Sequence, residues 1–315
     1  MATFKTVYCF LIAYIFTVCA AACYAEGSAW EKYIDAGESA MKQAHYSDAE
    51  QSFNAAMKEA KTVGPETQEV GVTLIDLGQL YEAQAKYKDA EGVDQQALQI
   101  MEKLFGPEHS EVGLILDNLG ELYLTEENYA KAEPLLKRSL KIKEKALGAD
   151  SPSINIPLNN LATLYLEQEK FADAEPLMKR SLQMTEKASG PNSPDTAARV
   201  NNLGELYVRQ AKYAEAEPLL ERALKIREKA LQPNHPDIGE SLVNLGGLYY
   251  RQGMYAKAEP FYKQSLAIRE KALGPDHPDV AATLELYAEL LRKTNRQAEA
   301  EKLDEQAKAI RAKQH

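Results

Sequence analysis

The strongest constraint on this chain is a 42-residue period that repeats through most of its length. The segment Asn202–Tyr207 has the sequence Asn-Leu-Gly-Glu-Leu-Tyr, and close copies begin at Asn118, Asn160 and Asn244. Each copy is followed by an aromatic residue and then by Ala-x-Ala-Glu-Pro. A fixed period of this length indicates a stack of similar supersecondary units rather than one globular core.

The first 25 residues have the pattern of a secretory signal. Lys5 precedes an apolar run at residues 7–22, and the small residue Ala25 ends an A-x-A-like cleavage site. The run is shorter than the roughly 20 residues that span a bilayer. We therefore expect a signal peptide at residues 1–25 and export of residues 26–315 to the periplasm or the exterior. An uncleaved membrane anchor is the alternative.

All three cysteines, Cys9, Cys19 and Cys23, lie inside this N-terminal segment. Lipid modification of Cys23 is a weaker alternative, because Ala20 stands where a lipoprotein signal usually carries leucine. Cleavage after Ala25 would leave no cysteine for a disulfide, a thiol nucleophile or a thiolate metal site. The mature chain would therefore depend on packing alone for its stability.

The charge of the chain argues against two classes of partner. The net charge is −10 over 315 residues, and the basic residues form no cluster. An acidic chain of this kind is a poor nucleic-acid binder and is repelled by anionic membrane surfaces. We expect contact with a membrane only through an uncleaved N-terminal segment.

Each repeat carries two helical patterns. In the first, apolar residues fall at Val200, Leu203, Leu206 and Tyr207, the spacing of a helix with one buried face. Gly204 lies inside this stripe, although glycine costs a helix up to about 1 kcal/mol relative to alanine. The same position holds a small residue in the other repeats, namely Gly78, Gly120, Ala162, Gly246 and Ala288. We infer that the second helix crosses closely over this position.

The turns between repeats carry helix-start signals. Ser151 and Ser193 precede a proline and are expected N-caps. His109, His235 and His277 take the same place in three other repeats. We do not expect these histidines to bind metal, because each is a whole repeat from the next and has no second ligand at i+3 or i+4. Pro157 is expected to remove one hydrogen bond or to shift the start of its helix.

These patterns predict an all-α solenoid of about seven helix-turn-helix repeats that fills residues 26–315. The first and last repeats are the least regular, as a solenoid with exposed end faces requires. The expected repeats are residues 29–63, 68–105, 110–147, 152–189, 194–231, 236–273 and 278–313.

The repeat resembles the tetratricopeptide pattern, Leu-x-x-Leu-Gly-x-x-Tyr followed by Tyr-x-x-Ala. In one repeat it is carried by Leu116, Gly120, Tyr123, Tyr129 and Ala132. The usual repeat has 34 residues. The eight additional residues, as in Ser-Leu-Ala-Ile-Arg-Glu-Lys-Ala-Leu-Gly-Pro-Asp-His-Pro-Asp at residues 265–279, resemble the long repeats of kinesin light chain. The resemblance implies a right-handed superhelix whose concave groove, lined by the first helices, holds extended peptides.

The motor role of kinesin light chain does not carry over to this chain. The heptad segment that holds the motor heavy chain is absent, and a signal pattern stands in its place. The resemblance therefore implies a fold and a mode of binding, and it names no partner.

A row of polar residues follows the expected groove. Two positions before the small residue lie Asn118, Asn160, Asn202 and Asn244, with Asp76 at the same place in the second repeat. One position earlier lie Asp117, Asn159, Asn201 and Val243. An asparagine can donate and accept at once, so such a row could pair with the backbone of an extended peptide. Alternatively, each asparagine ties its own helix to the next repeat.

The same face adds Glu121, Thr163, Glu205, Arg209 and Arg251, which make a mixed polar surface. The tyrosines at positions 81, 123, 165, 207 and 249 lie on the apolar stripe, so we expect them in the core. The candidate peptide-binding residues are Asn118, Asn159, Asn160, Asn201, Asn202, Asn244, Glu205, Arg209 and Arg251.

The sequence carries none of three common motifs of catalysis and cofactor binding. The sequence has no glycine-rich phosphate loop, no Gly-x-Ser-x-Gly and no His-Glu-x-x-His. Its acidic and basic residues alternate at helical spacing, as on solvated helix faces. We expect a non-catalytic scaffold without a cofactor that binds a protein or an extended peptide. A factor that assembles an envelope complex through the solenoid ends or by self-association is the alternative, and a catalytic protein is a distant third.

Overall fold

The computed structural model describes residues 28–313, so the predicted signal segment lies outside the described residues. Over this range the chain forms fourteen α-helices, one short 3-10 turn and no strand, which confirms the predicted helical repeat solenoid. None of these helices is both long and apolar enough to cross a membrane. The elements are α2 (Ala29–Lys42), α3 (Tyr46–Val63), α4 (Gln68–Ala83), α5 (Tyr87–Phe105), α6 (Ser110–Thr125), α7 (Tyr129–Leu147), η1 (Pro152–Ile154), α8 (Asn155–Glu167), α9 (Phe171–Ser189), α10 (Pro194–Arg209), α11 (Tyr213–Ala230), α12 (Pro236–Arg251), α13 (Tyr255–Leu273), α14 (Pro278–Lys293) and α15 (Gln297–Ala312).

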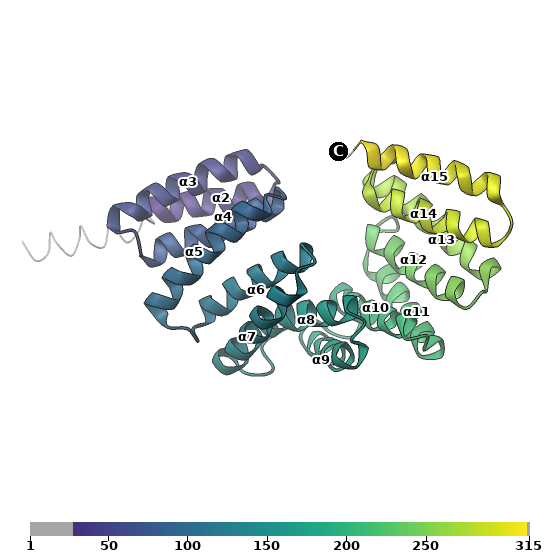
Figure 1. Ribbon diagram of the computed structural model, residues 1–315, viewed down its shortest axis with the longest axis horizontal. Coiled ribbons are helices and arrows are strands. Elements are labelled where there is room, and N and C mark those ends of the chain that lie inside the picture. The colour runs from purple at the N-terminus through teal and green to yellow at the C-terminus, as the bar shows by residue number, and fades with distance from the viewer. Residues whose placement is uncertain (1–27, 314–315) are drawn as a thin grey trace, which may run out of the picture. The chain divides into compact units, whose positions relative to one another are not determined.

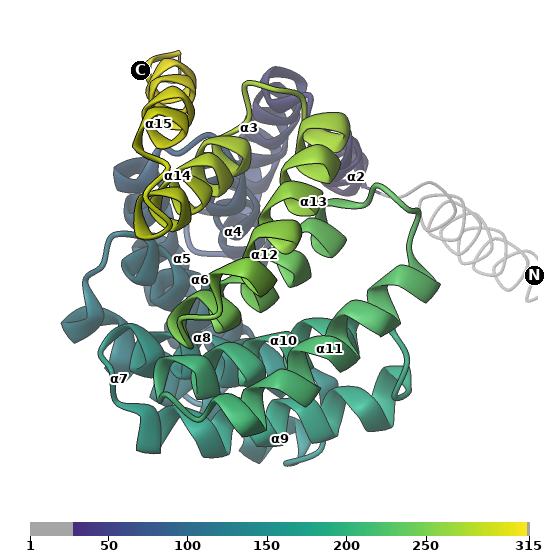
Figure 2. The same ribbon diagram turned by 90° about the vertical axis from the view of Figure 1, so that its right-hand side faces the viewer.

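Consecutive helices form pairs, from α2 with α3 to α14 with α15, and each pair is one repeat (Figure 1). The second helix of a pair also packs against the first helix of the next, as α11 does against α12 and α13 against α14 (Figure 2). The chain divides into two compact halves, Met1–Ala149 and Asp150–His315. We call them the N-terminal half and the C-terminal half and describe each by itself.

The glycine in the first helix is where the second helix crosses closely. A Cβ atom on Gly120 would lie 2.4 Å from the side chain of Leu136, and one on Gly204 would lie 2.7 Å from that of Leu220. Both leucines are fully buried. The small residue therefore lets two helix backbones approach, which offsets the helix propensity that glycine lacks. This is the reason for its recurrence that the sequence suggested.

The turn inside each pair needs a left-handed residue. Glu169 and Ala211 have φ of 56° and 58°, and Gly253 takes the same place in the next repeat with φ of 75°. A left-handed residue with a side chain costs roughly 1–2 kcal/mol, whereas glycine adopts it freely. Most repeats of this chain therefore hold a small strain at this turn.

The first helices are capped as the turn sequences suggest, with one exception. The Ser193 hydroxyl accepts a bond from the N–H of Thr196, at 3.1 Å. The histidines are caps too: Nδ1 of His235 accepts from the N–H of Asp237 at 3.3 Å, and His109 and His277 do the same in their repeats. Sequence analysis missed this capping role.

The exception is Ser151, whose side chain makes no capping bond. The prediction of a serine cap is wrong here because the helix starts later. Residues 152–154 form the 3-10 turn η1, and α8 begins at Asn155, so that Pro157 falls in its first turn. The backbone N–H groups of the first turn have no partner within the helix, so a proline, which lacks an N–H, is tolerated there. The expected shift of the helix start by Pro157 is thus observed.

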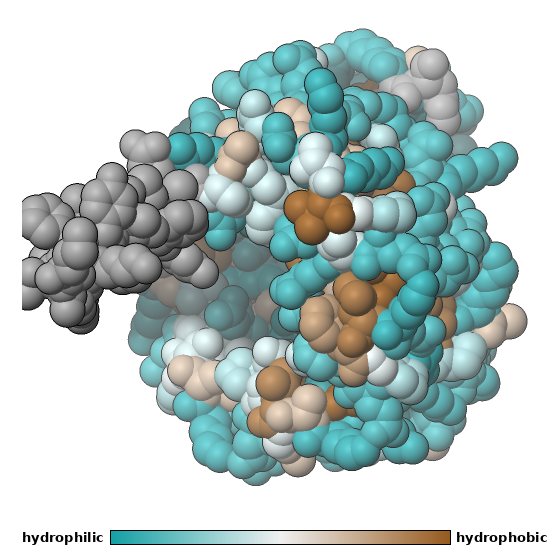
Figure 3. All heavy atoms as spheres, turned by 90° about the vertical axis from the view of Figure 1, so that its left-hand side faces the viewer, coloured by the Kyte–Doolittle hydropathy of each residue, from teal (hydrophilic) through white to brown (hydrophobic). Residues whose placement is uncertain are grey.

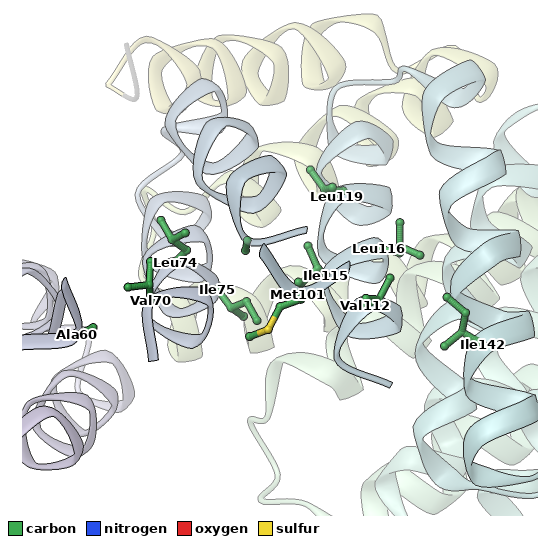
Figure 4. Close-up of a cluster of buried hydrophobic side chains, with 11 residues drawn as sticks. Ala60, Val70, Leu74, Ile75, Met101, Val112, Ile115, Leu116, Leu119 and Ile142 are labelled. Carbon is green, nitrogen blue, oxygen red and sulfur yellow. The ribbon is translucent and has the colours of Figure 1, made fainter. Parts of the chain in front are cut away.

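Within each half the core consists of buried apolar side chains that pack between neighbouring helices. In the N-terminal half, Leu74 and Ile75 of α4, Met101 of α5, and Ile115 and Leu116 of α6 lie in one buried cluster (Figure 4). Burying one such side chain contributes roughly 1.5–3 kcal/mol. On the face shown in Figure 3, apolar residues lie in small separate patches among polar ones.

Polar bonds tie neighbouring repeats together. The stripe tyrosines Tyr123, Tyr165 and Tyr249 are buried, and Tyr81 and Tyr207 are half-buried. The hydroxyls of Tyr123, Tyr207 and Tyr249 donate to a glutamate on the second helix of the previous repeat, in the case of Tyr249 to Glu217 at 2.6 Å. Arg227 is also buried and donates to the Asp237 carbonyl and the Ser241 hydroxyl, both at 2.8 Å. Repeat-to-repeat cohesion is therefore partly polar.

Candidate groove site

A cavity of about 540 Å³ opens on the first helices of the C-terminal half. It lies on α10, α12 and α14, with Glu169 and Phe171 contributing at the start of α9. Its lining includes four residues that sequence analysis selected, Glu205, Arg209, Asn244 and Arg251. The predicted polar face of these helices therefore borders a real concavity.

The two arginines of this cavity differ in their surroundings. Arg209 donates to Glu167 at 3.1 Å, to Glu205 at 3.2 Å and towards the Leu166 carbonyl at 3.5 Å. Arg251 is exposed, and no carboxylate of residues 28–313 lies within ion-pair distance of it. Arg209 is thus held in place, and Arg251 is the cation that a ligand could pair with.

A tyrosine and a carboxylate form the opposite part of the lining. The Tyr250 hydroxyl donates to Glu289 at 2.7 Å. Burial raises the pKa of Tyr250 to about 12, and its bond to Glu289 adds to the effect, so the hydroxyl keeps its proton at any physiological pH. Val208, Val243 and Leu286 supply apolar surface beside these groups. The cavity can therefore hold an apolar side chain next to polar backbone or charge.

Both asparagines at the earlier position, Asn159 and Asn201, already have hydrogen-bond partners within the protein. Asn201 is fully buried. Its amide donates to Glu240 at 3.1 Å and accepts from Asn244, also at 3.1 Å. Asn159 accepts from the Ser181 hydroxyl of its own pair at 2.8 Å. For Asn201 the bridging interpretation describes the contacts observed, and both of its amide atoms are already bonded.

The row of asparagines is not gathered into one cavity. Asn202 lies beside Asn159, Thr163 and Arg199 around a space of about 10 Å³, room for about one water molecule. Asn160 is half-buried on α8. Asn118 belongs to the N-terminal half, and its side-chain nitrogen is buried without a hydrogen-bond partner among the described residues. Only Asn244 of the row lines the large cavity.

Sequence reasoning missed Tyr250, Leu286 and Glu289. Leu286 stands one repeat after Asn244, so following the asparagine column into the last repeat would have found it. Tyr250 follows the stripe tyrosine Tyr249, and no motif marks it. Among residues 28–313 no group of three His, Cys, Asp or Glu side chains is placed to hold a metal ion.

Comparison with protein families decides the identity of the fold. The tetratricopeptide repeat model matches residues 90–145, 153–229, 198–271 and 237–313. The chain belongs to the tetratricopeptide repeat family. Tetratricopeptide arrays are typically non-catalytic scaffolds, and this architecture is consistent with protein–protein interaction. No curated protein matches the sequence.

Solved structures share the fold, and kinesin-light-chain-like repeats are among them. BtubC (BKLC) from P. vanneervenii is 24% identical with a TM-score of 0.60, over 79% of this chain and 94% of that one. A Podosopora anserina putative kinesin light chain with nearly identical repeats is 26% identical with a TM-score of 0.53, over 66% and 99%. A Rap protein complexed with competence and sporulation factor is 15% identical with a TM-score of 0.65, over 89% and 75%.

Proposed function

We propose that this tetratricopeptide protein is an exported, non-catalytic scaffold that binds an extended peptide segment of a protein partner on the first helices of its C-terminal half. The observation that carries the proposal is the cavity on α10, α12 and α14. It places the unpaired Arg251 beside Asn244 and the apolar side chains of Val208 and Leu286. The Rap protein solved with competence and sporulation factor is a relative in fold that was crystallised with a bound factor.

The cavity leaves polar, apolar and charged groups available to a ligand. An extended segment presents backbone N–H and C=O groups, which Asn244 and the glutamates of the lining can bond. Leu286 is 37% exposed, whereas the other leucines of α14 are buried. An apolar ligand side chain would cover it. Arg251 would pair with an acidic group next to that side chain.

Export is the part of this proposal that rests on the signal pattern of residues 1–25, and cleavage there would leave a mature chain without cysteines. The alternative is an envelope assembly factor that acts through the solenoid ends. The outer surface of α15 disfavours that alternative at the C-terminal end, since the large apolar residues exposed between residues 28 and 313 include none from this helix. Self-association through this surface would bury mainly charged side chains.

Photochemical crosslinking in the native compartment tests the proposal. A photoreactive phenylalanine analogue at Leu286 should capture a partner peptide, which mass spectrometry can identify. The same analogue at Lys225, which is exposed on the second helix α11, serves as the matched control. Capture at Lys225 but not at Leu286 would place the binding surface outside the cavity and overturn the proposal.

A further inference from the structure

The N-terminal half has a cavity of its own, of about 470 Å³, on its first two helix pairs. It is lined by side chains from the first helices α2 and α4 and from α3 behind them. These residues are Glu38, Met41, Lys42, Phe53, Asp76 and Gln79.

This cavity occupies the same repeat positions as the cavity of the C-terminal half. Asp76 lies four repeats before Asn244, two positions ahead of the small residue in each case. Glu38 stands at the same repeat position as Glu205, and Lys42 stands at the same repeat position as Arg209. The chain therefore forms one kind of groove site twice. The main chemical change is a carboxyl group at Asp76 in place of an amide.

The Asp76 carboxyl group lacks a counter-charge. Its Oδ2 atom is buried and has no hydrogen-bond partner among residues 28–313. The nearest cation of the lining, Lys42, lies 3.6 Å from Glu38, and its side chain is 77% exposed. An ionised carboxylate that is taken out of water without a partner is unfavourable. A positively charged ligand group would remove this penalty.

The two halves also differ in overall charge. Residues 28–149 include 22 acidic and 13 basic residues, whereas residues 150–315 include 24 and 23. The N-terminal half therefore carries almost the whole negative charge of the chain. Its field attracts cationic segments and repels acidic ones.

We propose that the cavity of the N-terminal half binds a lysine or arginine side chain of a basic peptide segment, with its charged head on Asp76 and Glu38. The apolar stem of such a side chain would lie on Met41 and Phe53, since long basic side chains pack their methylenes on apolar surface. This site is separate from the cavity around Arg251. It gives the protein a second binding surface of opposite charge preference.

Binding at this site depends on pH in a defined direction. Burial, with a further contribution from Glu38, raises the pKa of Asp76 to about 7. Other charged groups on the packed helices include Lys42 on α2, the Glu82–Asp94 pair of α4 and α5, and Glu121 of α6, which acts on Glu82. A cation favours ionised Asp76, so binding should strengthen and release a proton as the pH rises from 6 to 8.

The probes are two end-blocked heptapeptides, Gly-Ser-Leu-Lys-Leu-Ser-Gly and the same peptide with Nε-acetyl-lysine. Each is titrated into the purified full-length protein while amide shifts are followed by NMR. The lysine peptide should shift the Gln79 signal saturably, and the acetylated peptide should not. Asp76→Asn, which installs the residue found at position 244, should weaken lysine binding at pH 8 about tenfold, the usual effect of a lost charged hydrogen bond.

Asp35→Asn is the matched control, because Asp35 is exposed on α2 and undergoes the same chemical change. Its affinity should stay within about twofold of wild type, as screening of exposed charges implies. Equal affinity for both peptides, full affinity in Asp76→Asn, or no saturable shift at Gln79 would each overturn the proposal. Shifts confined to Gly247 and its neighbours would also overturn it, while leaving the proposed function of the C-terminal cavity intact.

Discussion

The second repeat contains a buried acid, Asp94, close to the half-buried Glu82, and this pair should make the N-terminal half sensitive to pH. Asp94 is fully buried against Gly78, and neither of its carboxylate oxygens has a partner among the described residues. Burial raises its pKa to about 8, and Glu82 adds to the effect. In the next repeat the positions of Glu82 and Asp94 are occupied by Leu124 and Leu136.

The size of the effect follows from linkage. Asp94 has a pKa of about 8 when folded and about 3.9 when unfolded, so the folded state holds its proton more tightly. The stability it contributes is complete below about pH 4 and is lost as the pH rises through 8. Each unit of pKa corresponds to about 1.4 kcal/mol, so the difference of about four units sets an upper limit of about 6 kcal/mol for this loss.

Asp94→Leu should remove this loss and add apolar burial. Leucine fits the position, because Leu136 and Leu220 pack on Gly120 and Gly204 in the same way. At pH 9 the variant should be more stable than wild type by about 2–5 kcal/mol, from the lost unpaired carboxylate and the buried leucine. At pH 4 the gain should be smaller, since the wild-type carboxyl group is then neutral.

The assay is urea unfolding at pH 4, 6 and 9, followed by the fluorescence of Trp30. This is the only tryptophan of the chain, and its indole donates to Thr73 at 2.9 Å, so it reports on the N-terminal half. Glu82→Arg gives a second test. In the last repeat Arg292 and Asp304 occupy the positions of Glu82 and Asp94, and they form an ion pair. An unchanged slope of stability against pH in Asp94→Leu, or a less stable variant at pH 9, would refute the reasoning.

Three further predictions concern local structure and processing. Gly204→Val should destabilise the C-terminal half by roughly 1–3 kcal/mol in thermal unfolding, because a Cβ there would lie 2.7 Å from Leu220; unchanged stability would mean that the crossing is looser than described. Ala211→Gly should raise stability by a few tenths to about 1 kcal/mol by relieving the positive φ that Gly253 adopts freely, and a loss would contradict the strain argument. Mass spectrometry of the mature protein should find an N-terminus at or near Glu26, and intact Met1 or Ala2 on soluble cytosolic protein would exclude export.

The helix pairs could be predicted because they depend on residues that recur every 42 positions. The stripe of Val200, Leu203 and Leu206 and the small residue at 204 determine both the helix face and the crossing. The serine cap predicted at Ser151 was wrong, because the helix start shifts towards Pro157 and leaves Ser151 before the 3-10 turn. The histidine caps were missed because histidine is not among the residue types preferred at helix N-caps.

The site was predictable only in part. Periodicity identifies the face that carries Glu205, Arg209 and Arg251, and these residues do line one cavity. Periodicity does not tell which asparagine of the row keeps its amide group free of bonds within the protein. That depends on long-range contacts, such as those that engage Asn201 with Glu240 and Asn244. The acids of the N-terminal half stand out only when their burial and missing partners are known.

The most direct test of the central claim is the affinity of the peptide that is captured at Leu286 for the Arg251→Glu variant. Arg251 is exposed and forms no ion pair within residues 28–313, so the substitution should leave helicity and melting temperature unchanged. The account predicts a loss of affinity of about tenfold or more, as a charged hydrogen bond is replaced by repulsion. Unchanged affinity in the folded variant would contradict the assignment of this cavity as the binding site.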